Sequence, residues 1–179
     1  MTKNNYSIHN QPENQLAASK TKSTIARSKS FALFCARIME DKKAENILVM
    51  DLSTSDGAPA EFFVIGSCLS EVQVDSVSSA IERGGKEAGE GFPKSEGWNA
   101  RQWVILDYFD VVVHVFHKEA RDFYRIEKLW SDADFYVLKE EKLSKMTKSA
   151  KQEFLNELSK ERRLPERFNQ HSSFEEDVI

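Results

Sequence analysis

The segment from Trp103 to His117 reads WVILDYFDVVVHVFH, and it decides the fold. It contains two runs of apolar, β-branched and aromatic residues, 103–106 and 111–116, with four residues between them. Such residues suit a packed, pleated sheet, and four residues are too few for a crossover helix, so the runs are predicted to pair antiparallel. The second run is apolar at nearly every position, which is typical of a strand covered on both faces. We therefore expect it to be the central strand of a sheet with helices packed on it.

The turn of this hairpin is the first candidate functional site. Asp107, Tyr108, Phe109 and Asp110 place two carboxylates and two aromatic rings at the rim of a buried sheet. A hydrophobic core needs none of these side chains at its rim. Aromatic anchors surrounded by polar groups are typical of protein interfaces, so the turn favours a binding function.

Outward from the hairpin, hydrophobic periodicity predicts an α/β fold, with a mixed β-sheet and helices packed on it. Ser70 and Gln73 have the spacing of a capping box, which marks the start of a helix. Helices are expected over 30–45, 70–88 and 118–130, and strands over 46–52, 62–65, 103–106, 111–116 and, at an edge, 135–138.

The two ends of the chain differ in composition from the middle. Residues 1–28 are polar and lack periodicity, so we expect a disordered arm before a single domain over residues 29–141. Residues 142–179 form an extension in which apolar residues recur at helical spacing from Leu143 to Leu158. An amphipathic helix within 143–160 and a mobile tail after it are predicted. Basic residues in 20–29 and 160–167 are interpreted as solvated tail charge, with contact to RNA as the alternative.

Composition limits the cell compartment and the kind of partner. No apolar run is long enough to cross a bilayer, and the Asn- and Gln-rich start lacks a secretory signal, which leaves an organellar transit peptide as an alternative to the cytoplasm. Cys35 and Cys68 form no disulfide framework and no zinc spacing, as expected in a reducing compartment. Residues 29–141 carry 13 Lys or Arg against 21 Asp or Glu. This acidic middle disfavours direct phosphate binding and favours a basic protein partner.

The sequence shows no catalytic motif. Asp107 and Asp110 could act as an acid and base pair, but no nucleophile or phosphate-binding loop lies near them in the sequence. Gly66-Ser67 with Asp75 is similar to part of a nucleotidyltransferase signature, yet the second carboxylate is missing because residue 77 is Val. We therefore expect no catalytic residues and no cofactor, and a protein that is not an enzyme.

A metal site is not expected either. His114 and His117 are three residues apart, which in a strand directs their side chains to opposite faces of the sheet. A histidine in the core and a histidine at the end of a strand are the ordinary interpretation.

Several blocks together resemble the ribosomal silencing factor, or Iojap, family. The two longest are Trp103–Tyr108 and Asp110–His117, and the match runs from about residue 29 to 134. The resemblance implies an α/β domain of nucleotidyltransferase-like topology that lacks the catalytic acids. Other matching blocks are Asp51-Leu52-Ser53, Phe63-Val64-Ile65, Glu96-Gly97, Phe123-Tyr124, Leu129-Trp130 and Asp132-Ala133.

The resemblance also implies a function. Family members are expected to bind the large ribosomal subunit through its fourteenth ribosomal protein and to block subunit joining, which represses translation under nutrient limitation. By position, Trp103, Asp107 and Tyr108 match the family's contact residues, and Glu96 and Asp110 are further candidates. Neither a membrane nor sequence-specific nucleic acid is implied as a partner, and a homodimer stays open.

The chain departs from the family pattern in three places. Phe109 stands where Gly is usual, so either the turn type differs or a strained residue is tolerated. Ala60-Glu61-Phe62 replaces Thr-Asp-Tyr, and Cys68 replaces a common Gly. Two alternative functions remain at this point: a divergent nucleotidyltransferase that uses Asp107 and Asp110, and a non-ribosomal adaptor that recruits a partner through the helix over 143–158.

Overall fold

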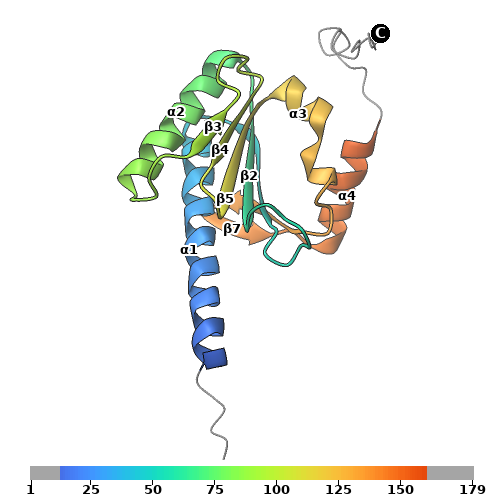
Figure 1. Cartoon of the computed structure of the whole chain (residues 1–179). Helices are drawn as coiled ribbons and strands as arrows, with labels where there is room; N and C mark the ends of the chain where they lie inside the picture. The colour runs from blue at the N-terminus through green and yellow to red at the C-terminus, as the bar shows by residue number, and fades with distance from the viewer. Residues whose placement is uncertain (1–12, 161–179) are drawn as a thin grey trace, which may run out of the picture.

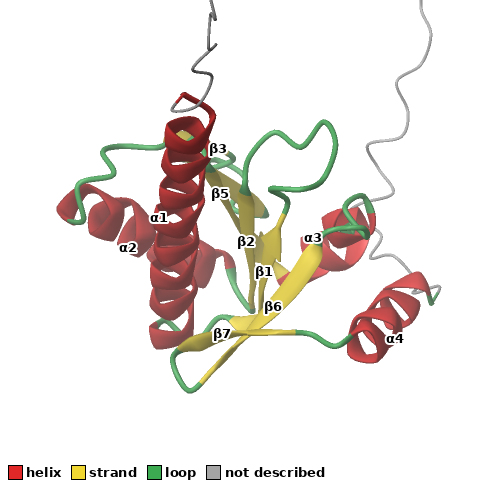
Figure 2. Ribbon diagram, turned by 90° about the horizontal axis from the view of Figure 1, so that it is seen from below, coloured by secondary structure: helices red, strands yellow, loops and turns green. Residues whose placement is uncertain are grey.

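A computed structural model of the chain describes residues 13–160. One mixed sheet lies between two groups of helices, α1 with α2 and α3 with α4 (Figures 1 and 2). The sheet has seven strands in the order β3-β4-β5-β2-β1-β6-β7, which confirms the predicted α/β fold class. The helices are α1 Glu13–Asp41, α2 Glu71–Glu87, α3 Lys118–Tyr124, η1 Ile126–Lys128 and α4 Lys148–Ser159, and the strands are β1 Glu45–Asp51, β2 Phe62–Cys68, β3 Lys94–Glu96, β4 Trp103–Asp107, β5 Val111–His117, β6 Asp134–Lys139 and β7 Lys142–Lys145.

The predicted hairpin is present, since β4 and β5 pair antiparallel. β5 is an internal strand, but the middle position of the sheet belongs to β2, which is buried along its whole length and pairs with β5 in parallel. The prediction of 111–116 as the central strand is therefore wrong by one strand. The second half of β2 gives a weak apolar signal because it contains Gly66, where an added Cβ would lie 2.7 Å from Sδ of Met39 on α1. A larger residue at this position would have to displace the end of the Met39 side chain, so the close approach of helix and strand favours glycine.

Two hydrophobic clusters fill the two sides of the sheet. α1 and α2 cover one face with residues that include Phe31, Cys35, Met39, Val74 and Ile81, packed on Val104 and Leu106 of β4. The other cluster is built on Leu48, Met50, Phe63, Ile65, Phe116 and Phe135, with α3 and α4 beside it. Both faces of the central strands are thus covered, as the continuous apolar runs predicted.

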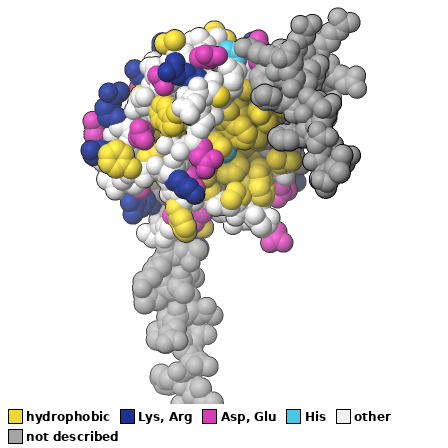
Figure 3. All heavy atoms as spheres, turned by 45° about the horizontal axis from the view of Figure 1, so that its top comes forward, with side chains coloured by type: hydrophobic (Ala, Val, Ile, Leu, Met, Phe, Trp, Pro, Cys, Tyr) yellow, Lys and Arg dark blue, Asp and Glu magenta, His cyan; other side chains and the backbone are white. Residues whose placement is uncertain are grey.

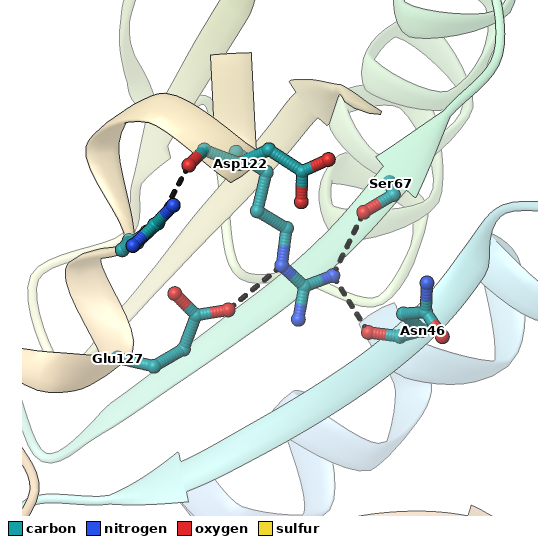
Figure 4. Close-up of polar contacts among 6 residues, drawn as sticks. Asn46, Ser67, Asp122 and Glu127 are labelled. Atoms are coloured by element: carbon teal, nitrogen blue, oxygen red, sulfur yellow. Dashed lines mark hydrogen bonds and ion pairs between the residues drawn. The ribbon is translucent and has the colours of Figure 1, made fainter. Parts of the chain in front are cut away.

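A buried ion pair holds α3 and η1 on the sheet (Figure 4). Nε of Arg121 lies 2.7 Å from Oε1 of Glu127, and the two side chains are 6% and 0% exposed. The same guanidinium donates to the carbonyl oxygen of Asn46 at 2.7 Å and to Oγ of Ser67 at 3.0 Å. Because a buried charge is costly unless it is paired, these contacts fix the position of α3 against β1 and β2.

The first helix is longer than predicted. Residues 13–28 are helical, so the predicted disordered arm over 1–28 is wrong for this part, and residues 1–12 lie outside the described residues. Before Ser28, the described side chains of this helix add only Ile25 to the hydrophobic cluster, so the hydrophobic period there is too weak to mark a helix. Arg27 anchors it through two hydrogen bonds to the carboxylate of Glu90, of 3.3 and 3.0 Å. The helix ends at Asp41 rather than 45, where Lys43 takes a φ of 62°.

Two further element predictions need correction. The helix expected over 118–130 ends at Tyr124, because Arg125 takes a left-handed φ of 47° and separates α3 from η1. The helix expected over 143–160 is confirmed only from Lys148 to Ser159, and its first residues form β7, which pairs with β6. The predicted strand over 135–138 is therefore not an edge strand, and the sheet extends beyond residue 141.

The predicted tail after residue 160 lies outside the described residues. No helix among residues 13–160 is both long enough and apolar enough to span a membrane.

Candidate partner-binding surface

The alternation of side chains along β4 decides which predicted residues share a surface. Val104 and Leu106 are fully buried in the cluster beneath α1 and α2. Trp103, Ile105 and Asp107 point to the opposite face and are only partly buried. Residues 103, 105 and 107 therefore form one row on the side of the sheet that carries α3.

Trp103 is held in place by three neighbours but remains partly exposed. Its ring stacks on Phe116 with a centroid distance of 4.7 Å and an interplanar angle of 23°, and it lies 4.9 Å from the ring of Tyr124. Its Nε1 donates a hydrogen bond to Nδ1 of His114 at 3.3 Å. The indole is thus oriented by its own domain while part of its surface is available to a partner, which is the arrangement of an interface anchor.

His114 supports this tryptophan from the strand beside it. The two residues lie on neighbouring strands, since His114 is paired with Ile105. The imidazole is 6% exposed and packs edge to face on Phe63, with a centroid distance of 4.6 Å. Burial disfavours the charged imidazolium and lowers the pKa of His114 to about 3, so the ring is neutral at physiological pH.

Aromatic rings continue on both sides of this pair. The ring of Phe63 contacts that of Trp130 at 6.2 Å, and Tyr124 contacts Phe123 at 4.9 Å. Tyr124 is 47% exposed, so the rings reach solvent. Figure 3 shows a broad group of hydrophobic side chains on one face of the molecule. We call the following six side chains the aromatic face: Phe63, Trp103, His114, Phe116, Tyr124 and Trp130.

Tyr108 does not lie beside Trp103. Its hydroxyl donates to the carbonyl oxygen of Ile81 on α2 at 3.3 Å, and its ring contacts Phe31 of α1 at 4.8 Å. Burial raises the pKa of the Tyr108 hydroxyl. Trp103 and Tyr108, which both match the family's contact residues, therefore lie on opposite faces of the sheet.

The three acidic candidates occupy different parts of this region. Asp107 lies in the row of Trp103, and its Oδ1 accepts a hydrogen bond from the backbone N–H of Phe109 at 2.8 Å. Glu96 is exposed on the short strand β3, opposite Ile105, and so faces the same side. The carbonyl oxygen of Asp110 accepts hydrogen bonds from the N–H groups of Glu61 and Phe62, at 2.9 and 3.0 Å. The turn is thereby tied to the start of β2.

Phe109 occupies the tip of the turn with a φ of 74° and is 85% exposed. Of the two outcomes left open for this position, a different turn or a tolerated strain, the positive φ shows the second. L-residues rarely adopt this conformation, because Cβ approaches the backbone too closely.

Nucleophilic chemistry finds no support among the described residues. Both cysteine side chains are buried, and burial raises the pKa of the Cys35 thiol and raises that of Cys68 to about 12. The hydroxyl of Ser67 accepts a hydrogen bond from Arg121. Among residues 13–160, no group of three or more His, Cys, Asp or Glu side chains could hold a metal ion.

Sequence reasoning missed His114, Tyr124 and Phe63 as parts of the site. The alternation rule that separated His114 from His117 would also have separated Trp103 from Tyr108, because the two residues are five positions apart, and an odd difference places side chains on opposite faces. Nothing local in the sequence indicates that Tyr124 of α3 returns to the ring of Trp103.

Known proteins similar to this chain point to one family. Residues 25–165 match the family model described as ribosomal silencing factor during starvation. The ribosomal silencing factor RsfS of Bacillus subtilis is 40% identical over 105 residues, which are 59% of this chain and 88% of that protein. The chloroplastic Iojap protein of Zea mays is 31% identical over 106 residues, which are 58% of this chain and 45% of that protein. A crystal structure of a Chromobacterium violaceum protein has a TM-score of 0.53 and 31% identity, and it covers 59% of this chain and 85% of that one.

Proposed function

The chain belongs to the ribosomal silencing factor family, and we propose that it represses translation by docking its aromatic face on the large ribosomal subunit. Members of this family bind the large-subunit protein uL14 and block the joining of the two subunits, and they are not enzymes. The predicted family, the silencing function and the absence of an enzymatic activity are thereby confirmed, and the divergent nucleotidyltransferase is set aside.

The partly exposed Trp103 is the observation that carries the proposed docking site. A large aromatic side chain that is fixed by stacking on Phe116 loses little conformational entropy when a partner covers it. Tyr124, at 47% exposed, extends the apolar surface next to it. Aromatic residues in such positions are the commonest energetic centres of protein interfaces.

Acidic groups around the aromatic face suit a basic partner. Asp107 follows Trp103 in the same row of β4, and Glu96 stands on the neighbouring strand β3. Asp110 lies beyond them at the end of the turn. We propose that these carboxylates steer a positively charged surface toward the face.

We assign Tyr108 a supporting role in this proposal. Its contacts with Ile81 and Phe31 attach the end of the hairpin to the helical layer behind it. A substitution at this position would therefore disturb the orientation of the turn rather than remove a direct contact of Trp103.

Steric exclusion is a sufficient mechanism. An interface of ordinary size buries about 800 Å² on each partner, and one or two aromatic anchors contribute about 2 kcal/mol or more each. A domain bound in this way occupies space that the small subunit requires, so no chemical step is needed.

Sedimentation with purified subunits tests the proposal. The chain is expected to pellet with large subunits and not with small subunits, and Trp103→Ala is expected to abolish pelleting while circular dichroism stays unchanged. Val72→Ala is a matched control, because Val72 is 73% exposed on α2, behind the opposite face of the sheet. Equal pelleting of Trp103→Ala and wild type would remove Trp103 from the interface.

Three finer points are part of the proposal. The domain is expected to have a nucleotidyltransferase-like topology without catalytic acids. The protein is expected in the cytoplasm, with an organelle as the alternative location. Both chloroplastic and mitochondrial proteins occur among the similar proteins. A homodimer stays open, and sedimentation equilibrium of the purified chain decides it.

A further inference from the structure

Phe109 contributes little to the fold that could explain its presence. Its ring is 85% exposed, so it gains almost nothing from burial. Its φ of 74° lies in the left-handed region, which glycine and asparagine adopt far more readily than phenylalanine. The side chain of Asp107 holds this conformation through the 2.8 Å hydrogen bond from the Phe109 N–H. A bulky ring is therefore exposed to solvent at a position where a smaller residue would suit the backbone better.

A hollow of about 260 Å³ lies beside this ring. The loop after β1 forms one wall, including Pro59 and Ala60, and Phe109 with Asp110 forms the other. The N–H of Glu61 donates to the carbonyl oxygen of Asp110 at 2.9 Å, which ties the two walls together. The hollow is thus formed by hydrogen-bonded backbone at the end of the hairpin. Its volume is below the roughly 300–1,000 Å³ that is typical of small-molecule pockets.

Charge identifies what this hollow can receive. Glu61 lines it, and Oε2 of Glu61 is buried without a hydrogen-bond partner among the described residues. Asp110 and Phe109 also line the hollow, so a second acidic residue and an aromatic residue border it. A cation is attracted both to an aromatic face and to carboxylates, so a lysine or arginine side chain of a partner suits this lining.

We propose that Phe109 is a second anchor for the ribosomal partner and that the hollow formed by Phe109, Glu61 and Asp110 receives a lysine or arginine side chain of that partner. This inference rests on the proposed function, since it places the contact on the same large-subunit protein that the aromatic face binds. The hairpin would then contact its partner at two places, through Trp103 on β4 and through Phe109 at the tip of the turn.

Substitutions at Phe109 separate binding from stability. Phe109→Gly and Phe109→Asn relieve the backbone strain, so each is expected to unfold at an equal or higher urea concentration than wild type. Both are expected to bind purified large subunits about tenfold more weakly in sedimentation binding curves, whereas Phe109→Tyr is expected to keep wild-type affinity. Lower stability together with weaker binding would show that Phe109 serves the fold, and it would overturn the proposal.

Removing the charge of one carboxylate tests whether the hollow binds a cation. Glu61→Gln keeps the shape of the side chain and is expected to weaken binding about threefold to tenfold and to reduce its dependence on salt. Glu87→Gln, an exposed change near the end of α2, is the control and is expected to have no effect.

The Trp103→Ala variant distinguishes the two proposals. If Trp103→Ala loses binding while Phe109→Gly and Glu61→Gln match wild type, the cation site is wrong and the docking through the aromatic face stands. If wild type does not bind large subunits at all, the proposed function is wrong, and the site at Phe109 is wrong with it.

Discussion

The indole Nε1 of Trp103 donates a hydrogen bond to Nδ1 of His114 at 3.3 Å, and this bond joins the exposed part of the aromatic face to its buried part. A ring nitrogen that accepts a hydrogen bond carries no proton, so the neutral imidazole has its proton on Nε2. Burial favours the same neutral state, because it lowers the pKa of His114 to about 3. The orientation of Trp103 is therefore coupled to a histidine that stays uncharged.

The depressed pKa of His114 predicts a pH dependence of stability. Below the ordinary histidine pKa of about 6.5, the unfolded chain binds a proton that the folded chain does not bind, so stability falls as the pH decreases from about 6.5 toward 3. The loss from this residue amounts to at most about 1.4 kcal/mol per pH unit. Urea denaturation of wild type and His114→Phe at pH 4, 5 and 6 measures it. The free energy of unfolding of the variant should fall less steeply with decreasing pH than that of wild type. Equal pH dependence of the two proteins would mean that His114 does not cause the loss of stability.

The contact between Tyr108 and Gly85 predicts that the effect of Gly85→Ala on stability depends on the Tyr108 side chain. Glycine inside a helix normally costs about 1 kcal/mol relative to alanine. At Gly85, however, an added Cβ would lie 2.5 Å from the hydroxyl oxygen of Tyr108. Gly85→Ala is therefore expected to destabilise wild type by about 1–3 kcal/mol, and to be neutral or stabilising when Tyr108 is already alanine. Urea denaturation of the four proteins of this cycle gives the coupling energy directly. If Gly85→Ala stabilises wild type, Tyr108 is not packed against α2.

The buried pair of Arg121 and Glu127 predicts a large loss when only one partner is removed. Glu127 is fully buried, so Glu127→Gln leaves the guanidinium without its counter-charge and is expected to cost about 3–5 kcal/mol. Replacing both residues together, as Arg121→Met with Glu127→Leu, is expected to cost less than the single change, because only the hydrogen bonds to the Asn46 carbonyl and Ser67 Oγ are then lost and no charge is left buried. Thermal unfolding compares the variants, with Lys160→Met as the control for an exposed ion pair. A double variant less stable than Glu127→Gln would contradict this interpretation.

The hairpin could be predicted from sequence because its signal is local. Two apolar runs with a four-residue break leave few alternatives, and β4 and β5 pair as expected. The start of α1 could not be found in this way, since Ile25 is the only described side chain before Ser28 that joins the hydrophobic cluster, and one residue gives no period. β7 was mistaken for a helix because Leu143 and Met146 have a spacing that suits a helical turn as well as a strand end.

The site was predictable in its residues but not in its geometry. The sequence places aromatic and acidic residues at the turn, yet the face that each occupies depends on the pleat of β4. The contact of Trp103 with His114 depends on the register between two strands, and that register is set by the turn conformation at Phe109. The contacts of Arg121 with Asn46 and Ser67 join segments 54 or more positions apart, so no local pattern could indicate them.

The carboxylates beside Trp103 predict the salt dependence of ribosome binding. Asp107 is partly exposed and Glu96 is exposed on the docking side, where charges mainly accelerate the encounter of two proteins rather than stabilise the complex. The association rate with large subunits is therefore expected to fall several-fold between about 50 and 200 mM salt, with little change in the dissociation rate. Asp107→Asn combined with Glu96→Gln should flatten this dependence. The asparagine keeps an oxygen that can accept the hydrogen bond from the Phe109 N–H, so the turn is preserved. Stopped-flow measurements at four salt concentrations give the salt dependence of the association rate for wild type and for the double variant. Glu87→Gln is the matched charge change on α2. If the double variant has the same slope as wild type, other charges steer the encounter, and the row along β4 contributes only its apolar contacts.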